Sequence, residues 1–390
     1  MGFGSKLSKS NIKESLMDKF TGKTSFEQWF SPISSKLFNK MVNELQLDYY
    51  TKKLYMAPFM KLLLFAQLHG TESLHALSDA VFSDDLQKMI GFESISVSQL
   101  GRRLNTVPTS FFENIFLDLV MQIHEKTNFQ NRRKTSTPWM LIDSTTLPLH
   151  LQNHKWAEFR KTKSGVKLHL RLLFMEKGLS YPDKAILTNA IEHDRGQLEL
   201  FVDDKECLYV FDRGYLDYER FDRMTDDGYF FVTRPRKNAV IRVIKTFNLS
   251  KNSSILSDEM VVIGSTQNRP ENFFRIIKTL DNNGKELTLI TNRFDLDPEE
   301  ISDVYKSRWA IELFFKWIKQ HLSIKKFYGH SEQAVHNQVY VAMIVYCLNV
   351  LAQLSTNSAR SYLQISRYLK ASLWKSSHLW IRKIQEKGVP

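Results

Sequence analysis

The segment 305–319 constrains the fold most strongly, because it predicts a largely buried helix that nevertheless carries charged side chains. Asp297 and Pro298 precede it with residues typical of a helix start, and no Gly or Pro interrupts it. On a wheel of about 100° per residue, its polar side chains gather within an arc of roughly 60°. They are Tyr305, Arg308, Glu312 and Lys319.

Apolar residues, among them Trp309, Leu313 and Trp317, occupy most of the remaining surface of this helix, as is typical of a buried one. Charged groups on a buried helix are costly unless they meet partners or a ligand. One carboxylate that can hold a metal, set among cations that can hold phosphates, indicates phosphodiester chemistry.

Two apolar strands predicted earlier in the chain each end in an aspartate. Asp143 follows the run 139–142, and Asp212 follows the run 208–211. Ligands of α/β sheets gather at the C-terminal ends of strands, so we expect both aspartates on one rim with Glu312. Hard carboxylate oxygens suit Mg²⁺, with Mn²⁺ as a substitute. Two such ions can activate an attacking hydroxyl and stabilise the leaving oxygen.

Each of these residues also has an ordinary structural interpretation. An aspartate after a strand is commonly a turn or helix-cap residue. Glu312 could be the buried ion-pair partner of Arg308 or Lys316. The repeated strand–aspartate pattern and the charged helix together favour a divalent-metal nucleic-acid enzyme over an ordinary basic α/β protein.

The charge balance favours a polyanionic partner. Lys and Arg number 54 against 42 Asp and Glu, a formal net charge of +12. A merely basic protein is the alternative. Cys207 and Cys347 lie in apolar runs and predict buried thiols in a reducing compartment. The longest apolar stretch, 339–354, is short for a membrane span, so we expect a soluble intracellular protein without a membrane partner.

The first 130 residues predict several helices, including 58–68 and 111–124, with Gly70 and Gly91 ending two of them. A late helix carries Arg102 and Arg103, both expected to be exposed. This pattern fits a helix-turn-helix-like module that binds DNA, and it fits a plain helical bundle equally well.

Beyond residue 135 the pattern becomes α/β. A strand at 166–174 places Lys167 and His169 on one face, where they are candidate DNA contacts or simply a solvated strand face. His193 and Asp194 lie near this core in sequence, with no catalytic role assigned. The predicted divisions are 1–130 (helical), 135–235 (first part of the core), 236–296 (β-rich insertion), 297–330 (core helix with the glutamate) and 331–390 (helical C-terminal region).

The motif Tyr305-x₂-Arg308-x₃-Glu312-x₆-Lys319 resembles the Tyr-Arg-Glu-Lys signature of the fourth insertion-sequence family of DDE transposases. The segments 142–145 and 211–215 are similar to the two aspartate boxes of that family, in the form found in Bacillus-type bacteria. The resemblance covers nearly the whole chain. It implies a ribonuclease H-like catalytic core with a β-rich insertion, a helical N-terminal DNA-binding domain and a helical C-terminal region.

The resemblance also implies roles for individual residues. Asp143, Asp212 and Glu312 would hold two Mg²⁺ ions. Tyr305, Arg308 and Lys319 would contact phosphates at the cleaved transposon end, for which their donors are suited. A flipped base would stack on an aromatic ring of the insertion. The candidates are Phe273, Phe274 and Phe294.

The activity implied is cut-and-paste movement of the protein's own insertion sequence in the bacterial cytoplasm, at the nucleoid. The partners would be double-stranded DNA, as terminal inverted repeats and target, and a second copy of the chain on that DNA. A nick would free a 3′-hydroxyl, which would form a hairpin end before joining to the target. Two alternatives stay open: a metal-dependent nuclease or resolvase of the same fold, and a catalytically idle DNA-binding protein derived from a transposase.

Overall fold

The computed structural model describes residues 22–129, 137–176, 179–250, 253–264, 270–281, 283–321 and 327–386. The chain divides into two compact units. One unit is helical and combines the chain up to Thr127 with the chain from His321 onward. The other spans Asn128–Gln320 and contains the β-sheet.

The helical unit joins the N-terminal and C-terminal parts of the chain around one long helix, α14. Helices α8, α4, α7, α2, α15 and α16 all contact α14. Residues 331–390, which the sequence divisions treat separately, therefore share a core with the N-terminal helices. The helices are α2 Ser25–Phe30, α3 Ser35–Glu44, α4 Met56–His69, α5 Leu74–Ala80, α6 Asp84–Ile90, α7 Val97–Thr106, α8 Thr109–Lys126, α14 Glu332–Thr356, α15 Tyr362–Ala371 and α16 Ser377–Gln385.

Local sequence signals set several of these helix ends. Gly70 and Gly91 follow α4 and α6 with left-handed backbones, at φ of 68° and 83°, as their positions predict. Ser96 caps α7 in a reciprocal pair of hydrogen bonds with Gln99. The predicted helices 58–68 and 111–124 are confirmed. The first begins two residues earlier and ends one residue later than predicted, and the second extends by two residues at each end.

By length and composition alone, α14 could cross a membrane, which corrects the expectation that this stretch is too short. The helix has 25 residues because it continues past the apolar stretch at both ends. However, 72% of its most apolar window is buried inside the protein. That is the environment of a core helix.

A polar residue in the middle of α14 ties the core of the helical unit together. Asn349 is fully buried, accepts a hydrogen bond from Trp29 Nε1 (2.9 Å) and donates one to Ser366 Oγ (2.9 Å). We expect Asn349→Leu to lower the free energy of unfolding by about 2–4 kcal/mol, because both partners would stay buried without it. Urea denaturation measures this, with Asn114→Leu on the exposed face of α8 as the control. Equal stability of the two variants would contradict the prediction.

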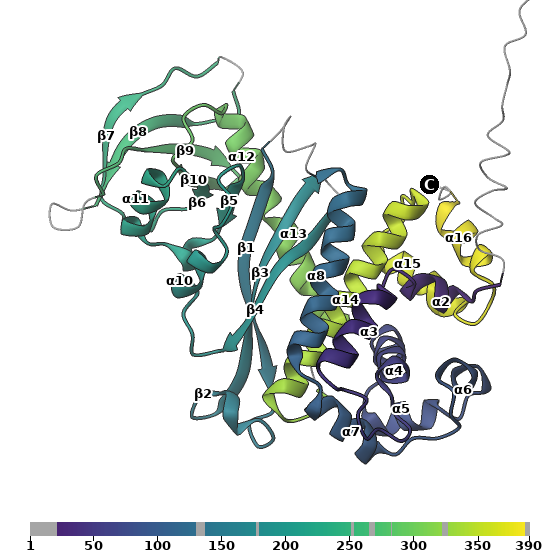
Figure 1. The fold of residues 1–390 in the computed structure, drawn as a ribbon. Helices are drawn as coiled ribbons and strands as arrows, with labels where there is room; N and C mark the ends of the chain where they lie inside the picture. Colours follow the sequence, from purple (N-terminus) through teal and green to yellow (C-terminus); the bar gives the residue numbers. More distant parts are fainter. Residues whose placement is uncertain are drawn as a thin grey trace, which may run out of the picture. The chain divides into compact units, whose positions relative to one another are not determined.

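The second unit is built on one ten-stranded sheet with the order β2-β3-β1-β5-β6-β10-β9-β8-β7, and β4 pairs with β3 off this path. Figure 1 shows the long strands β1, β3 and β4 beside the shorter ones. The strands are β1 Trp139–Leu149, β2 Glu158–Arg160, β3 Lys163–Glu176, β4 Leu179–Asn189, β5 Leu208–Phe211, β6 Phe230–Thr233, β7 Ile241–Thr246, β8 Ser257–Ile263, β9 Phe274–Leu280 and β10 Glu286–Thr291. The helices of this unit are α10 Asp194–Gln197, α11 Tyr218–Asp226, α12 Pro298–Ser307 and α13 Trp309–His321.

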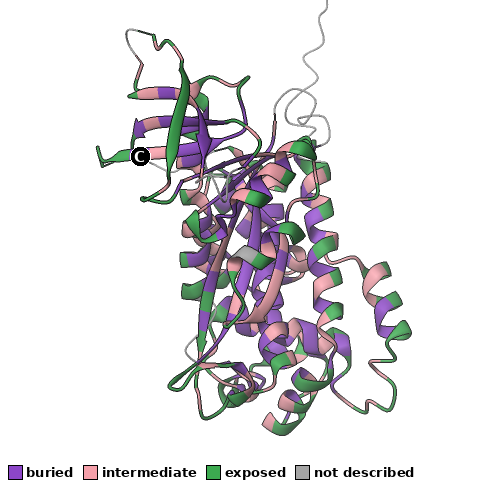
Figure 2. Cartoon of the chain, turned by 90° about the vertical axis from the view of Figure 1, so that its left-hand side faces the viewer, coloured by how far each residue is buried: buried purple, intermediate pink, exposed green. Residues whose placement is uncertain are grey.

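The β-rich segment 236–296 continues the main sheet instead of forming a sheet of its own. Its last strand, β10, pairs antiparallel with β6, and β9, β8 and β7 follow outward in turn. β7 is the edge strand and is exposed along its whole length (Figure 2). The sheet therefore runs without a break from the predicted core into the predicted insertion.

The predicted helix 305–319 is divided in two at Arg308. Ser307 Oγ donates to the carbonyl of Val304 (2.6 Å), and the backbone N–H groups of Arg308 and Ile311 bond three residues back instead of four. Such a side-chain bond competes with the helical ladder and tightens the turn. The prediction of one uninterrupted helix is therefore wrong at this point.

The predicted burial of this segment is half right. Ile311 and Ile318 are fully buried, as their stripe predicts. Trp309 and Leu313, however, are 58% and 51% exposed. The helix pair therefore packs along one face and presents aromatic and charged side chains on the other.

Candidate active site

The sheet register brings the two aspartates together. β1 and β5 are parallel, and their last pair is Ile142 with Phe211, so Asp143 and Asp212 come next on neighbouring strands. Asp212 follows the end of β5 as predicted, but Asp143 lies within β1, which continues to Leu149 by pairing with β3. The side chains are held by backbone donors. Asp143 Oδ1 accepts from the N–H of Ser144 (2.8 Å), and Asp212 Oδ1 accepts from that of Gly214 (2.6 Å).

Arg308 links the first aspartate to the glutamate. Its Nη2 donates to Glu312 Oε1 (2.5 Å), and its Nη1 donates to Asp143 Oδ2 (3.3 Å). The Tyr305 ring lies beneath the same guanidinium, 5.7 Å from Cζ to the ring centroid. The ion pair between Glu312 and Arg308, one of the two interpretations left open by the sequence, is therefore present. Through Arg308 it also connects Glu312 to Asp143.

The pKa of Asp143 is raised by burial and by a neighbouring carboxylate. Burial, reinforced by the neighbouring charge of Asp212, raises its pKa to about 7, although the Ser144 N–H and Arg308 oppose the rise. A raised carboxylate pKa of this kind falls when a cation binds nearby.

The donor chemistry of the site fits a hard divalent cation, since carboxylate oxygens are its preferred ligands. Among the residues that the structure describes, however, no group of three or more His, Cys, Asp or Glu side chains is arranged to hold a metal ion. Arg308 instead forms ion pairs with both Asp143 and Glu312.

A fourth carboxylate, Asp194, adjoins the site, and the sequence analysis assigned it no role. Ser144 Oγ donates to Asp194 Oδ1 (2.5 Å), and Lys167 Nζ lies 3.3 Å from the same oxygen. Because Ser144 directly follows Asp143, Asp194 fixes the chain next to the first aspartate. The residue begins α10 after the loop that leaves β4, a position that no periodic pattern marks.

Two of the predicted DNA contacts in the second unit, His169 and Lys167, contact other residues of the protein instead. His169 has no exposed surface, and its Nε2 contacts Thr188 Oγ1 (2.9 Å). Burial lowers its pKa to about 4, so the ring is neutral at physiological pH. The interpretation of His169 as a direct DNA contact is therefore wrong. Lys167 is half-buried and donates to the Glu192 carbonyl (2.9 Å) besides contacting Asp194.

The other candidates divide by exposure. Arg102 is exposed on α7 as expected, but Arg103 is not, because it donates to the Leu47 carbonyl and pairs with Asp48, both at 2.5 Å. In the second unit Lys319 is exposed, whereas Tyr305 is buried. Of the aromatic candidates, Phe274 is fully buried and thus unable to receive a base, while Phe273 and Phe294 are partly exposed.

Gly214 is required by the close approach of the Asp212 side chain. A Cβ at this position would lie 2.9 Å from Asp212 Oδ1 and 3.5 Å from Asp194 Oδ2. We expect Gly214→Ala to displace the Asp212 carboxylate and to lower Mn²⁺ affinity about tenfold, as changes around metal ligands commonly do. Isothermal titration calorimetry measures the affinity. Gly196→Ala in α10 is the matched control, since a Cβ there meets nothing within 4 Å. An unchanged affinity in Gly214→Ala would contradict the prediction.

Carboxylates on adjoining parallel strands, with cations beside them, are typical of phosphoryl-transfer enzymes whose acidic residues hold divalent ions. Residues 135–348 match the family model described as the transposase DDE domain. The chain therefore belongs to this family of transposases. A second model, for a domain of unknown function (DUF4372), matches residues 21–92 in the helical unit.

Two curated relatives and one solved structure are similar to this chain. The chain is 31% identical over 268 residues to a probable transposase for insertion sequence element IS5377 of Geobacillus stearothermophilus, covering 68% of this chain and 69% of the relative. It is 29% identical over 305 residues to a protein provisionally described as the transposase of element IS4SA from Synechocystis, covering 75% and 82%. Among solved structures, the piggyBac transposase synaptic complex with hairpin DNA is similar at a TM-score of 0.46 and 11% identity, covering 95% of this chain and 83% of that one.

Proposed function

We propose that this transposase moves its own insertion sequence by cutting both ends of the element and joining them to target DNA. The observation that carries the proposal is the linked set Asp143–Arg308–Glu312, with Asp212 beside it, in a chain of the DDE transposase family.

The three carboxylates would hold Mg²⁺ or Mn²⁺, two ions in each site, and the ions would supply activation of the attacking hydroxyl and stabilisation of the leaving oxygen. Arg308 offsets part of the negative charge of Asp143 and Glu312 while no cation is bound. Once it releases Glu312, its planar fork of donors is available to a DNA phosphate. Ser144, held by Asp194, keeps its backbone N–H on Asp143 and so orients that carboxylate.

Of the DNA contacts predicted from the sequence, we retain those whose side chains are accessible or lie at the carboxylates. Lys319 is exposed on α13, Arg308 lies at the carboxylates with Tyr305 behind it, and Arg102 is exposed on α7. Lys319 and Arg308 would bind phosphates of the cleaved end. Arg102 would contribute to binding the terminal inverted repeats, whether through a helix-turn-helix-like module or through the surface of a helical bundle.

The finer steps follow from this assignment. Hydrolysis would free a 3′-hydroxyl, this hydroxyl would attack the opposite strand to give a hairpin end, and the opened ends would join the target. Two ends must be held at once, so we propose a homodimer on DNA. The net charge of +12 is consistent with association with the bacterial nucleoid.

A paired-end joining assay tests the function. Purified protein is incubated with Mg²⁺, DNA carrying both flanks of its reading frame and a target plasmid, and the products are sequenced. The transposase produces junctions between element ends and target. Cleavage without joining would support a nuclease or resolvase of the same fold, and end binding without either would indicate an idle derivative.

A further inference from the structure

A basic pocket adjoins Asp212 on the side where Asp194 lies, and the proposed function does not use it. Its volume is about 620 Å³. Four of its lining residues are cationic and one is a carboxylate. The lining consists of Lys167, His193, Asp194, Gly196, Arg213, Gly214, Leu216, Arg220 and Arg236.

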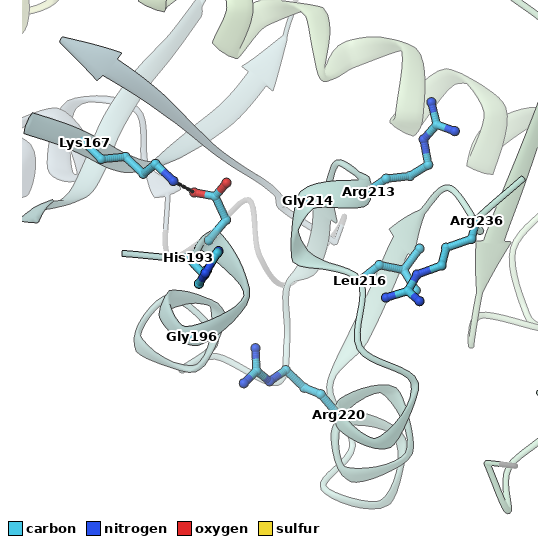
Figure 3. Close-up of a pocket in the computed structure, with 9 residues that line it drawn as sticks. Lys167, His193, Gly196, Arg213, Gly214, Leu216, Arg220 and Arg236 are labelled. Carbon is cyan, nitrogen blue, oxygen red and sulfur yellow. Dashed lines mark ion pairs between the residues drawn. The ribbon is translucent and has the colours of Figure 1, made fainter. Parts of the chain in front are cut away.

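The cations of this pocket come from separate elements and are only partly neutralised. Arg220 on α11 is buried and pairs with Glu199 (3.2 Å), and Lys167 on β3 lies against Asp194 (3.3 Å). Arg213 and Arg236 are exposed, and within the described part of the chain neither forms an ion pair. Figure 3 shows Lys167, Arg220 and Arg236 entering from different sides, whereas Arg213 extends away from these three. The pocket therefore carries positive charge that is available to bind an anion.

The surroundings point to a phosphate of a DNA backbone as that anion. Guanidinium forks match phosphate geometry, and a polyanion that approaches the carboxylates needs cations on its path. The volume exceeds that of a single phosphate and admits a stretch of sugar–phosphate chain. Gly214, which lines the pocket, donates its N–H to Asp212, so an occupant lies next to the second aspartate.

Two basic surfaces thus border one carboxylate site. The first, on α12 and α13 with Glu312, is the one that the proposed function assigns to the cleaved end. A joining enzyme must also hold the strand that is attacked. We propose that the pocket of Lys167, Arg220 and Arg236 binds backbone phosphates of the target DNA during joining. This inference rests on the proposed function. It assigns the target DNA a binding site separate from that of the cleaved element end.

The test is the charge reversal Arg236→Glu, which alters an exposed side chain and leaves Asp194 and Gly214 in place. Arg242→Glu, on the exposed edge strand β7 of the same unit, makes the same charge change outside the pocket and is the control. Both are compared with the unmodified protein in two reactions: cleavage of an uncut end, and joining of a pre-cleaved end to a target plasmid. Thermal melting verifies that each variant is folded.

We expect Arg236→Glu to slow joining about tenfold or more, the usual size for loss of a charge-assisted phosphate contact, while its cleavage stays within about twofold of the unmodified rate. Higher target concentration should restore part of the joining. Unchanged joining would overturn the proposal. An equal loss of cleavage and joining would also overturn it, because the contact would then serve the element end. Failure of the unmodified protein to cleave or join would overturn the proposed function itself. This outcome is distinct from any difference between the variants and the unmodified protein.

Discussion

Glu312→Gln is expected to abolish cleavage of element ends, slowing it on the order of a thousandfold, while binding to the same DNA persists. Gln keeps the size of the side chain and can still accept a hydrogen bond from Arg308. It carries no charge, however, so it is a poor ligand for a hard divalent cation. Denaturing gels of nicked ends measure the cleavage, and fluorescence anisotropy of labelled end DNA measures the binding.

The matched control is Glu300→Gln, which makes the same chemical change on the exposed first turn of α12. Its cleavage should equal that of the unmodified protein. Asp143→Ala and Asp212→Ala should behave like Glu312→Gln. Near-normal cleavage with Mg²⁺ in any of the three variants would remove that residue from the proposed set of metal ligands.

Asp143→Asn is expected to stabilise the metal-free protein at neutral pH although it removes activity. The folded pKa of Asp143 is about 7, against an ordinary value of 3.8. Between these values the folded protein binds the proton more tightly than the unfolded chain does. Stability from this group is therefore present at low pH and is lost as pH rises through the folded pKa. Asn imitates the protonated form and should raise the free energy of unfolding above pH 7 by about 1–3 kcal/mol.

Urea denaturation in EDTA at pH 5 and pH 8 measures this difference. The unmodified protein should lose stability relative to Asp143→Asn between the two pH values. Added Mg²⁺ should restore stability to the unmodified protein and have little effect on the variant, because a ligand of the folded state stabilises it. A variant that is less stable than the unmodified protein at pH 8 would contradict the burial and charge repulsion argued for this site.

The proximity of the two aspartates could be predicted because it follows from how parallel strands pair. Each follows an apolar run of four residues, and the parallel pairing of β1 with β5 stops just before the two aspartates, which places them side by side. The approach of Glu312 followed from the charged arc of its helix. The break at Ser307 did not, because whether a serine hydroxyl bonds back to the helix or faces solvent depends on its surroundings. The metal-binding and DNA-binding roles of these residues stay predictions.

The wrong predictions concern which other residues pack over an exposed-looking face of a strand or helix. Alternation along 166–174 correctly placed Lys167 and His169 on one side of a strand, but it could not show that Asp194 and Thr188 lie over that side. Arg103 was misplaced for the same reason, since its partner Asp48 is distant in sequence. Asp194 itself was missed because its contacts with Ser144 and Lys167 arise only when three separate segments meet.

The central claim is that Asp143, Asp212 and Glu312 hold the catalytic metal ions of a DNA-joining enzyme. Asp212→Cys tests it most directly, because a thiolate is a poor ligand for Mg²⁺ and a better one for the softer Mn²⁺. End cleavage by this variant should be undetectable in Mg²⁺ and measurable in Mn²⁺, whereas Asp212→Ala should be inactive with both ions. Equal inactivity of Asp212→Cys in the two metals, or equal activity in both, would contradict the assignment of Asp212 as a metal ligand.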